Sequence, residues 1–243
     1  MSGQFLVNSW TIGLCAVAAL CDNGASTSIC QLDFRSQPFN QTCDQPMQPQ
    51  EYAKLTARFQ TARIELITHL LVLGTTILLL WVLETVDQLF WQGALDFYGI
   101  EPRTTHGLRN IFLAPFLHQG FDHLIANTLP FLVLGWFVLV RGLRKFILVS
   151  VITATVSGLG IWLLGRPATI HIGLSGVIFG YLGFLLFRGY FERSSEAIGL
   201  AILVGFLYGS MIWDVLPQQP NISWLSHLFG FFGGALAARY LTR

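Results

Sequence analysis

Six long hydrophobic segments are the feature that most constrains how this chain can fold. They contain 15 to 23 residues each and span 64–86, 123–140, 146–164, 173–187, 197–212 and 224–241. A helix needs about 20 apolar residues to cross the hydrocarbon of a bilayer. Backbone polar groups in lipid must be paired within the chain, and the alternating pattern of a membrane barrel is absent. The segments therefore predict membrane-spanning helices.

Composition supports the same class. The chain is 53% hydrophobic and only 11% charged, whereas soluble domains have about 25% charged residues. We therefore expect an all-α polytopic membrane protein, with the lipid bilayer as its main partner. The formal net charge is +1, which offers no basic surface for nucleic acid.

Basic residues predict the orientation of the segments. Most of them lie in connections on one side: Lys54, Arg58, Arg63, Arg141, Arg144, Lys145, Arg188, Arg193, Arg239 and Arg243. The opposite side has only Arg103, Arg109 and Arg166. Since cytoplasmic loops carry the excess of Lys and Arg, we expect residues 50–63 and the C-terminus in the cytoplasm. The expected location is the plasma (inner) membrane.

Residues 1–60 read as an N-terminal extension of a membrane domain that covers 61–243. Residues 5–20 are mostly apolar and are expected to form either an extra span or an interfacial segment. A secretory signal would have a basic residue before its apolar region, and none precedes this segment. Residues 21–50 are polar and predict a linker. The four cysteines, Cys15, Cys21, Cys30 and Cys43, have spacings that indicate neither a metal site nor a disulfide framework.

The connection 87–122 is rich in aromatic residues. We expect it to lie partly in the membrane interface, where aromatic side chains are enriched.

Polar residues cluster at the outer ends of three predicted spans. His123 and Asn127 are four residues apart and share one helix face, Ser175 begins the fourth segment, and His227 lies at the start of the sixth. Polar groups inside spans are costly and indicate function. The fourth segment is short, about 22 Å at 1.5 Å per residue, so we expect Ser175 to lie below the outer surface.

Glycines on two segments predict a close helix pair. They are Gly176, Gly180 and Gly183 on the fourth segment, and Gly230 and Gly234 on the sixth. Small residues let helices approach closely in lipid. Such packing would bring the Ser175 hydroxyl within reach of the His227 imidazole.

Each polar residue also has an ordinary structural interpretation. Taken alone, Ser175 would bond within its own helix, Asn127 would link two helices, and His227 would bind a carbonyl. Asp214 is expected to face the outer interface, so the sequence predicts a Ser-His dyad without an orienting acid. His118, His123, His171 and His227 lack the spacing of a known zinc motif, and no metal or cofactor is expected.

Three motifs together resemble the rhomboid family of intramembrane serine proteases. They are Gly173-Leu174-Ser175-Gly176, His123-x-x-x-Asn127 after Ala114-Pro115-Phe116-Leu117-His118, and His227-x-x-Gly230-x-x-x-Gly234. The resemblance covers roughly residues 60 to 243. It implies a six-helix core, with Ser175 as nucleophile and His227 as general base.

The resemblance also implies an oxyanion site and a class of substrate. The oxyanion would be held by the side chains of His123 and Asn127 and by the backbone N–H of Ser175. Substrates would be membrane proteins, cut in or near a transmembrane helix and commonly after a small residue. Two departures are visible: Phe179 stands where the family often has tyrosine, and the Trp-Arg pair of the first outer loop is absent.

Two other functions remain open at this point. A non-catalytic relative would bind membrane clients, but such relatives typically lack the serine or the histidine, and both are present here. A transporter would be supported by inverted repeats or charged residues at mid-span, and neither is clear.

Overall fold

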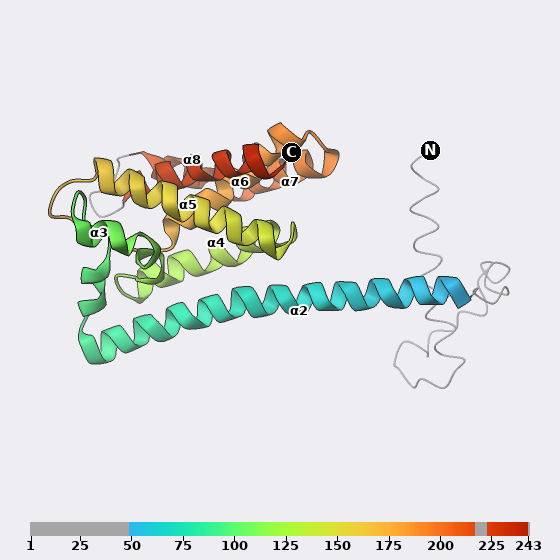
Figure 1. The fold of residues 1–243 in the computed structure, drawn as a ribbon, viewed down its shortest axis with the longest axis horizontal. Coiled ribbons are helices and arrows are strands. Elements are labelled where there is room, and N and C mark those ends of the chain that lie inside the picture. The colour runs from blue at the N-terminus through green and yellow to red at the C-terminus, as the bar shows by residue number, and fades with distance from the viewer. Residues whose placement is uncertain (1–48, 217–222, 243) are drawn as a thin grey trace. The chain divides into compact units, whose positions relative to one another are not determined.

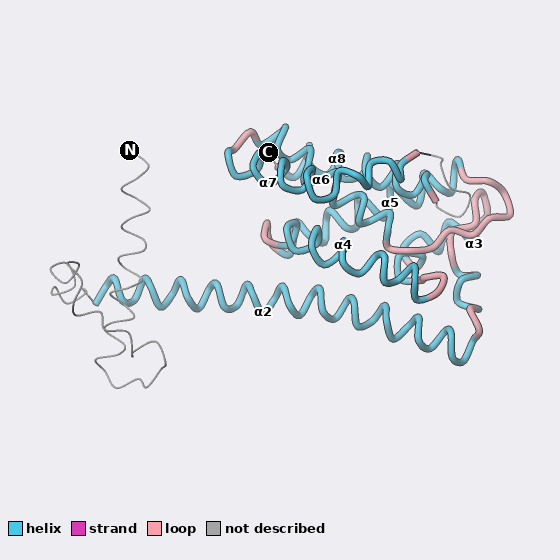
Figure 2. Tube along the Cα trace, turned by 180° about the vertical axis from the view of Figure 1, so that it is seen from behind, coloured by secondary structure: helices cyan, strands magenta, loops and turns pink. Residues whose placement is uncertain are grey.

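A computed structural model of the protein describes residues 49–216 and 223–242. The described chain consists of helices joined by loops, with no strand in it (Figure 2). Its long helices are α2 (Pro49–Val86), α4 (Phe121–Leu139), α5 (Leu143–Leu164), α6 (Ser175–Glu192), α7 (Ser195–Tyr208) and α8 (Trp224–Leu241). The prediction of an all-α polytopic fold is confirmed.

The chain divides into two compact units, residues 1–61 and 62–243. The described part of the first unit is the N-terminal part of α2, which begins at Pro49, inside the segment predicted to be a linker. The predictions for residues 5–20 and 21–48, and for the four cysteines, lie outside the described residues.

Four helices of the described chain are long and apolar enough to cross a membrane. They are Ala53–Trp91, Phe121–Leu139, Leu143–Leu164 and Ser195–Val215. α6 and α8 fall outside this set although both have 18 residues. Both carry several glycines, and their buried faces pack on protein, so they need less apolar surface than helices that face lipid.

α6 is the central helix of the second unit. It contacts α4, α5, α7 and α8 (Figure 1), and most of its residues from Gly176 to Leu185 are fully buried. The buried hydroxyl of Tyr181 is paired with Ser150 Oγ at 2.7 Å, which satisfies a polar group that would be costly to leave alone. The hydrophobic core therefore forms around α6.

Glycines set the close approach of α6 and α8. A Cβ atom at Gly230 would overlap the carbonyl oxygen of Gly176, and one at Gly234 would overlap that of Gly180. These positions leave no room for any side chain. The two helix backbones therefore touch along this line.

Buried polar residues on α2 and α6 have partners. His69 on α2 packs on Trp136 of α4, with ring centroids 4.8 Å apart. Arg188 is buried and pairs with Glu192, which also pairs with Arg141 at 3.2 Å. This cluster joins the ends of α4 and α6.

The connection between α2 and α4 is built from short helices. They are η4 (Asp87–Trp91), η5 (Ala94–Tyr98), α3 (Thr105–Arg109), η6 (Asn110–Phe112) and η7 (Ala114–Phe116). Ile100, Ile111 and Ala114 form a small second core with Ile161 of α5. Phe97 and Phe112 remain exposed, and the expected place of this segment in the membrane interface stays a prediction.

Candidate active site

Ser175 is the first residue of α6, at the end of a tightly held loop. The helix was predicted to begin at Gly173, but Gly173 has φ 114° and belongs to the loop. Its N–H donates to the carbonyl of Ala114 at 3.0 Å. The glycine is needed because this φ disfavours any residue with a Cβ.

The same glycine fixes the ring of His123. A Cβ at position 173 would lie 2.6 Å from His123 Cε1, so the imidazole of α4 packs directly on the loop that leads to Ser175. The absence of a side chain at Gly173 therefore brings His123 close to the start of α6.

Three helices contribute side chains to one large cavity of about 800 Å³. His123 and Asn127 come from α4, Ser175 from α6, and His227 from α8. The remaining lining residues are Gln119, Ala126, Pro130, Thr169, Ile170, His171, Ile172, Ile178, Phe179, Met211, Asp214 and Ser223. All four residues singled out for chemistry in the sequence thus face one space.

His227 is held on two sides. Its ring stacks on Phe179, with centroids 4.0 Å apart and planes 8° apart. Its Nδ1 lies 3.0 Å from the backbone carbonyl oxygen of Asp214. Because a carbonyl only accepts, Nδ1 carries a proton, so in the neutral imidazole the lone pair is on Nε2.

Asp214 is exposed, and its predicted place at the outer interface stays a prediction. It belongs to η8 (Gly209–Val215), and it lines the cavity. The group that orients His227 is therefore a main-chain carbonyl rather than an acid side chain. Every residue has such a carbonyl, so residue types alone carry no signal for this contact.

The Ser175 hydroxyl makes no hydrogen bond to any residue in the described part of the chain, His227 included. It can therefore rotate within the cavity. Catalytic hydrogen bonds in free enzymes are often long and tighten only when substrate binds.

Asn127 is buried, and its Nδ2 donates to the carbonyl of His123 at 2.9 Å. The amide nitrogen carries two hydrogens, so one remains to donate into the cavity. His123 and Asn127 thus sit one turn apart, with donors on the side from which α4 lines the cavity.

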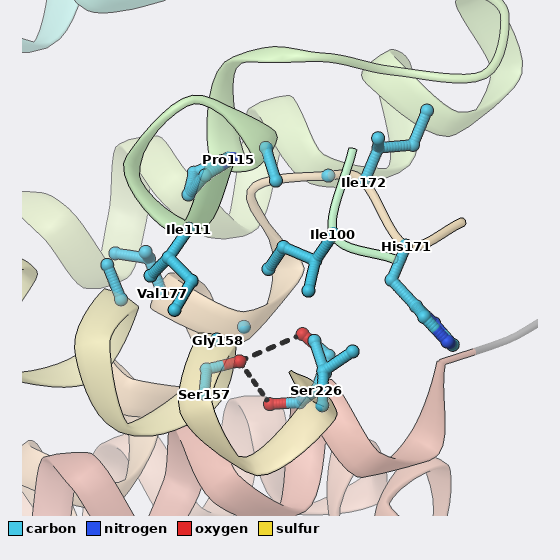
Figure 3. Close-up of a pocket in the computed structure, with 14 residues that line it drawn as sticks. Ile100, Ile111, Pro115, Ser157, Gly158, His171, Ile172, Val177 and Ser226 are labelled. Carbon is cyan, nitrogen blue, oxygen red and sulfur yellow. Dashed lines mark hydrogen bonds between the residues drawn. The ribbon is translucent and has the colours of Figure 1, made fainter. Parts of the chain in front are cut away.

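A polar contact between α5 and α8 lies beside the first turn of α6. Ser157 of α5 bonds to both the carbonyl and the hydroxyl of Ser226, each at 3.0 Å (Figure 3). A Cβ at Gly176 would collide with both hydroxyls. α5, α6 and α8 therefore meet directly beneath Ser175.

Burial favours the neutral form of two histidines in the loops. Burial, and secondarily the neighbouring His123, lowers the pKa of His118 to about 3. Burial also lowers the pKa of His171, whose backbone pairs with Ile100 in both directions. Within the described ranges, no group of three or more His, Cys, Asp or Glu is placed to hold a metal ion.

Comparison with known proteins gives one family match. The model of the Rhomboid domain matches residues 105–243, which is more than half of the chain and includes all four residues discussed above.

Curated relatives extend the match. "Uncharacterized protein Rv1337" of Mycobacterium tuberculosis (strain ATCC 25618 / H37Rv) is 41% identical over 181 residues, covering 70% of this chain and 75% of the relative. "Uncharacterized protein ML1171" of Mycobacterium leprae (strain TN) is 40% identical over 182 residues, covering 70% and 71%. "Putative rhomboid protease YdcA" of Bacillus subtilis (strain 168) is 27% identical over 191 residues, covering 74% and 92%.

Proposed function

Because the chain belongs to the rhomboid family, we propose that it is an intramembrane serine endopeptidase. Ser175 would be the nucleophile and His227 the general base of a Ser-His dyad. The observation that carries the proposal is the shared cavity: Ser175, His227, His123 and Asn127 come from three helices and line one space.

The first chemical step follows from the state of His227. With Nδ1–H bound to the carbonyl of Asp214, the Nε2 lone pair can accept the Ser175 proton. Ser175 Oγ then forms a bond to the carbonyl carbon of the scissile peptide, whose oxygen becomes an oxyanion. Phe179 keeps the ring in plane by stacking, as the tyrosine of related sequences would.

Neutral donors would stabilise that oxyanion. The second hydrogen of Asn127 Nδ2, a ring N–H of His123 and the backbone N–H of Ser175 are the groups available. Loss of one such donor costs about 3 to 4 kcal/mol in soluble proteases. None of the three adds negative charge to the site.

The intermediate then collapses and the acyl-enzyme is hydrolysed. Protonated His227 gives its proton to the leaving amine as the C–N bond breaks, which leaves an ester on Ser175. Water then attacks the ester with His227 again as base, so that the carboxylate product and free Ser175 are released.

The size of the cavity supports a peptide substrate. A volume of about 800 Å³ falls in the range of sites that enclose a ligand. A helical segment has its peptide carbonyls engaged, so a transmembrane substrate must unwind before its carbonyl can reach Ser175. We therefore propose transmembrane proteins as substrates.

The basic connections support an orientation for this site. The chain is an integral membrane protein. Arg141, Lys145, Arg188 and Arg193 lie at the end of the helices away from Ser175. By the positive-inside rule, we place this end and the C-terminus in the cytoplasm, in the plasma membrane, and the cavity near the outer leaflet.

Cleavage of a model transmembrane substrate in liposomes tests the activity. We expect Ser175→Ala and His227→Ala to abolish cleavage while each protein still inserts and melts like the wild type. Ser195→Ala is the matched control, because Ser195 is exposed at the start of α7, and it should cleave normally. Undiminished cleavage by either site variant would refute the dyad.

A further inference from the structure

Glu84 is a carboxylate that the reaction above does not use. It lies on α2, two residues before the end of the helix, and is only 3% exposed. Its Oε1 accepts a hydrogen bond from the N–H of Gly120 at 2.8 Å and a second from Gln88 Nε2 at 3.0 Å. A buried carboxylate is costly unless it is bonded in this way, so the position calls for a physical reason.

Gly120 is the residue that precedes α4. No side chain caps the N-terminus of α4 locally, although the first N–H groups of a helix lack partners within it. Glu84 supplies an acceptor and a negative charge from another helix, 36 residues upstream. A hydrogen-bond acceptor and a negative charge are both stabilising at the N-terminus of a helix, where the helix dipole is positive. Glu84 therefore acts as a remote cap for α4.

A second residue of α2 strengthens the contact. Trp81 is one turn before Glu84, and its Nε1 donates to Thr128 Oγ1 at 3.3 Å. Its ring also packs on Phe121, with centroids 6.1 Å apart. The end of α2 therefore contacts the N-terminal part of α4 at three residues, Gly120, Phe121 and Thr128.

These contacts with α2 lie on a different face of α4 from the face that lines the cavity. Phe121 and Thr128 are seven residues apart and share the helix face that meets α2, while His123 and Asn127 share another face and line the cavity. A helix moves as a rigid body over so short a length. Any shift of the α4 N-terminus against α2 would therefore displace both proposed oxyanion donors.

Resting on the proposed function, we propose that Glu84 is a positioning residue for the reaction. By accepting the Gly120 N–H, its carboxylate sets the depth and rotation of the α4 N-terminus, and so aims His123 and Asn127 at the carbonyl oxygen of the substrate. It acts through α4 and does not touch the reacting atoms.

The test measures kcat and KM for a transmembrane substrate in liposomes, with thermal melting as the check on folding. A misplaced donor costs about tenfold or more in rate, so Glu84→Ala should lower kcat about tenfold with little change in KM. Glu84→Gln keeps an acceptor oxygen at the same reach and should stay within about threefold of wild type. Glu65→Ala is the matched control, because Glu65 is an exposed carboxylate on the same helix.

Glu84→Asp separates charge from reach. It keeps the charge but is one methylene shorter, so it should behave like Glu84→Ala. If Glu84→Ala does not fold, the comparison of Glu84→Asp with Glu84→Gln still tests the proposal. A normal kcat for folded Glu84→Asp, together with a large loss for Glu84→Gln, would overturn the proposal.

A double-mutant cycle with Asn127→Ala shows whether Glu84 acts through the oxyanion donors. Because Glu84→Ala would still displace His123, we expect its cost to fall from about tenfold to about threefold once Asn127 is gone. A full, independent loss in that background would assign Glu84 a purely structural role and contradict the inference. Absence of Ser175-dependent turnover in the wild type would instead refute the proposed function itself, and the inference with it.

Discussion

At the scale of single residues, the site depends on a glycine as much as on its polar groups. Gly173 combines a φ of 114° with direct packing on the His123 ring. A methyl group there would push the ring away from the start of α6. The polar residues are thus held by the shape of the backbone around them.

Gly173→Ala tests this packing. We expect cleavage to fall about a hundredfold, because His123 moves from its place. Gly142→Ala is the matched control, since Gly142 also has a positive φ, 102°, but nothing lies within 4 Å of an added Cβ. Its rate should stay within about twofold of wild type, and equal losses in both variants would mean that backbone strain alone is responsible.

The sequence singled out polar residues that the structure finds lining one cavity, but it did not indicate how they are held. Ser175, His227, His123 and Asn127 could be selected because polar side chains at one depth of a membrane are costly and therefore informative. The Asp214 carbonyl and the Glu84 bond to Gly120 could not. Both use main-chain atoms of a remote segment, and main-chain atoms are the same at every position.

At the scale of helices, the close pairing of α6 and α8 organises the site. Gly176 and Gly180 face Gly230 and Gly234 without room for a side chain. This contact places the first turns of the two helices, which carry Ser175 and His227, against one another.

Gly234→Ala tests the pairing away from the chemistry. The added methyl group would meet the Gly180 carbonyl and the Phe184 N–H, so we expect a loss of about 1 to 3 kcal/mol in stability from overpacking. Gly199→Ala is its control, because Gly199 lies on α7 with nothing within 4 Å. That variant should melt at or slightly above the wild-type temperature, and a Gly234→Ala protein that melts with it would refute the close contact.

The helices themselves were predictable where burial in lipid dictates composition. α4, α5 and α7 match the predicted segments within a few residues. α2 begins at Pro49, before the predicted start at residue 64. The prediction missed these N-terminal turns because they are polar and give no hydrophobic signal. The short helices of residues 87–116 could not be placed, because their buried residues pack on remote segments such as Ile161 rather than in a local periodic pattern.

At the scale of the whole molecule, stability should depend on pH through the connection between α2 and α4. Burial raises the pKa of Asp96 from 3.8 to about 6, and the neighbouring charges of Asp87 and Glu84 add to the effect. The folded protein thus binds this proton more tightly than the unfolded chain does. Its contribution to stability is present at low pH and is lost as the pH rises from about 4 to about 6.

Asp96→Asn should remove that part of the pH dependence. We expect the melting temperature of the wild type to fall, relative to the variant, between pH 4.5 and pH 6.5 in detergent. Asp122→Asn is a suitable control, since Asp122 is an exposed aspartate at the start of α4. Parallel melting curves for the wild type and Asp96→Asn across this range would contradict the raised pKa.

The proposed activity requires that Ser175 and His227 act together as a nucleophile and its base. The most direct measurement is mass-spectrometric labelling of the membrane-embedded protein by a fluorophosphonate. We expect a single adduct on Ser175 in the wild type, and labelling slower by a factor of about a hundred or more in His227→Ala. Absence of an adduct on Ser175 in folded wild-type protein, or an equal rate in the two proteins, would contradict the dyad and favour a rhomboid relative that only binds its membrane partners.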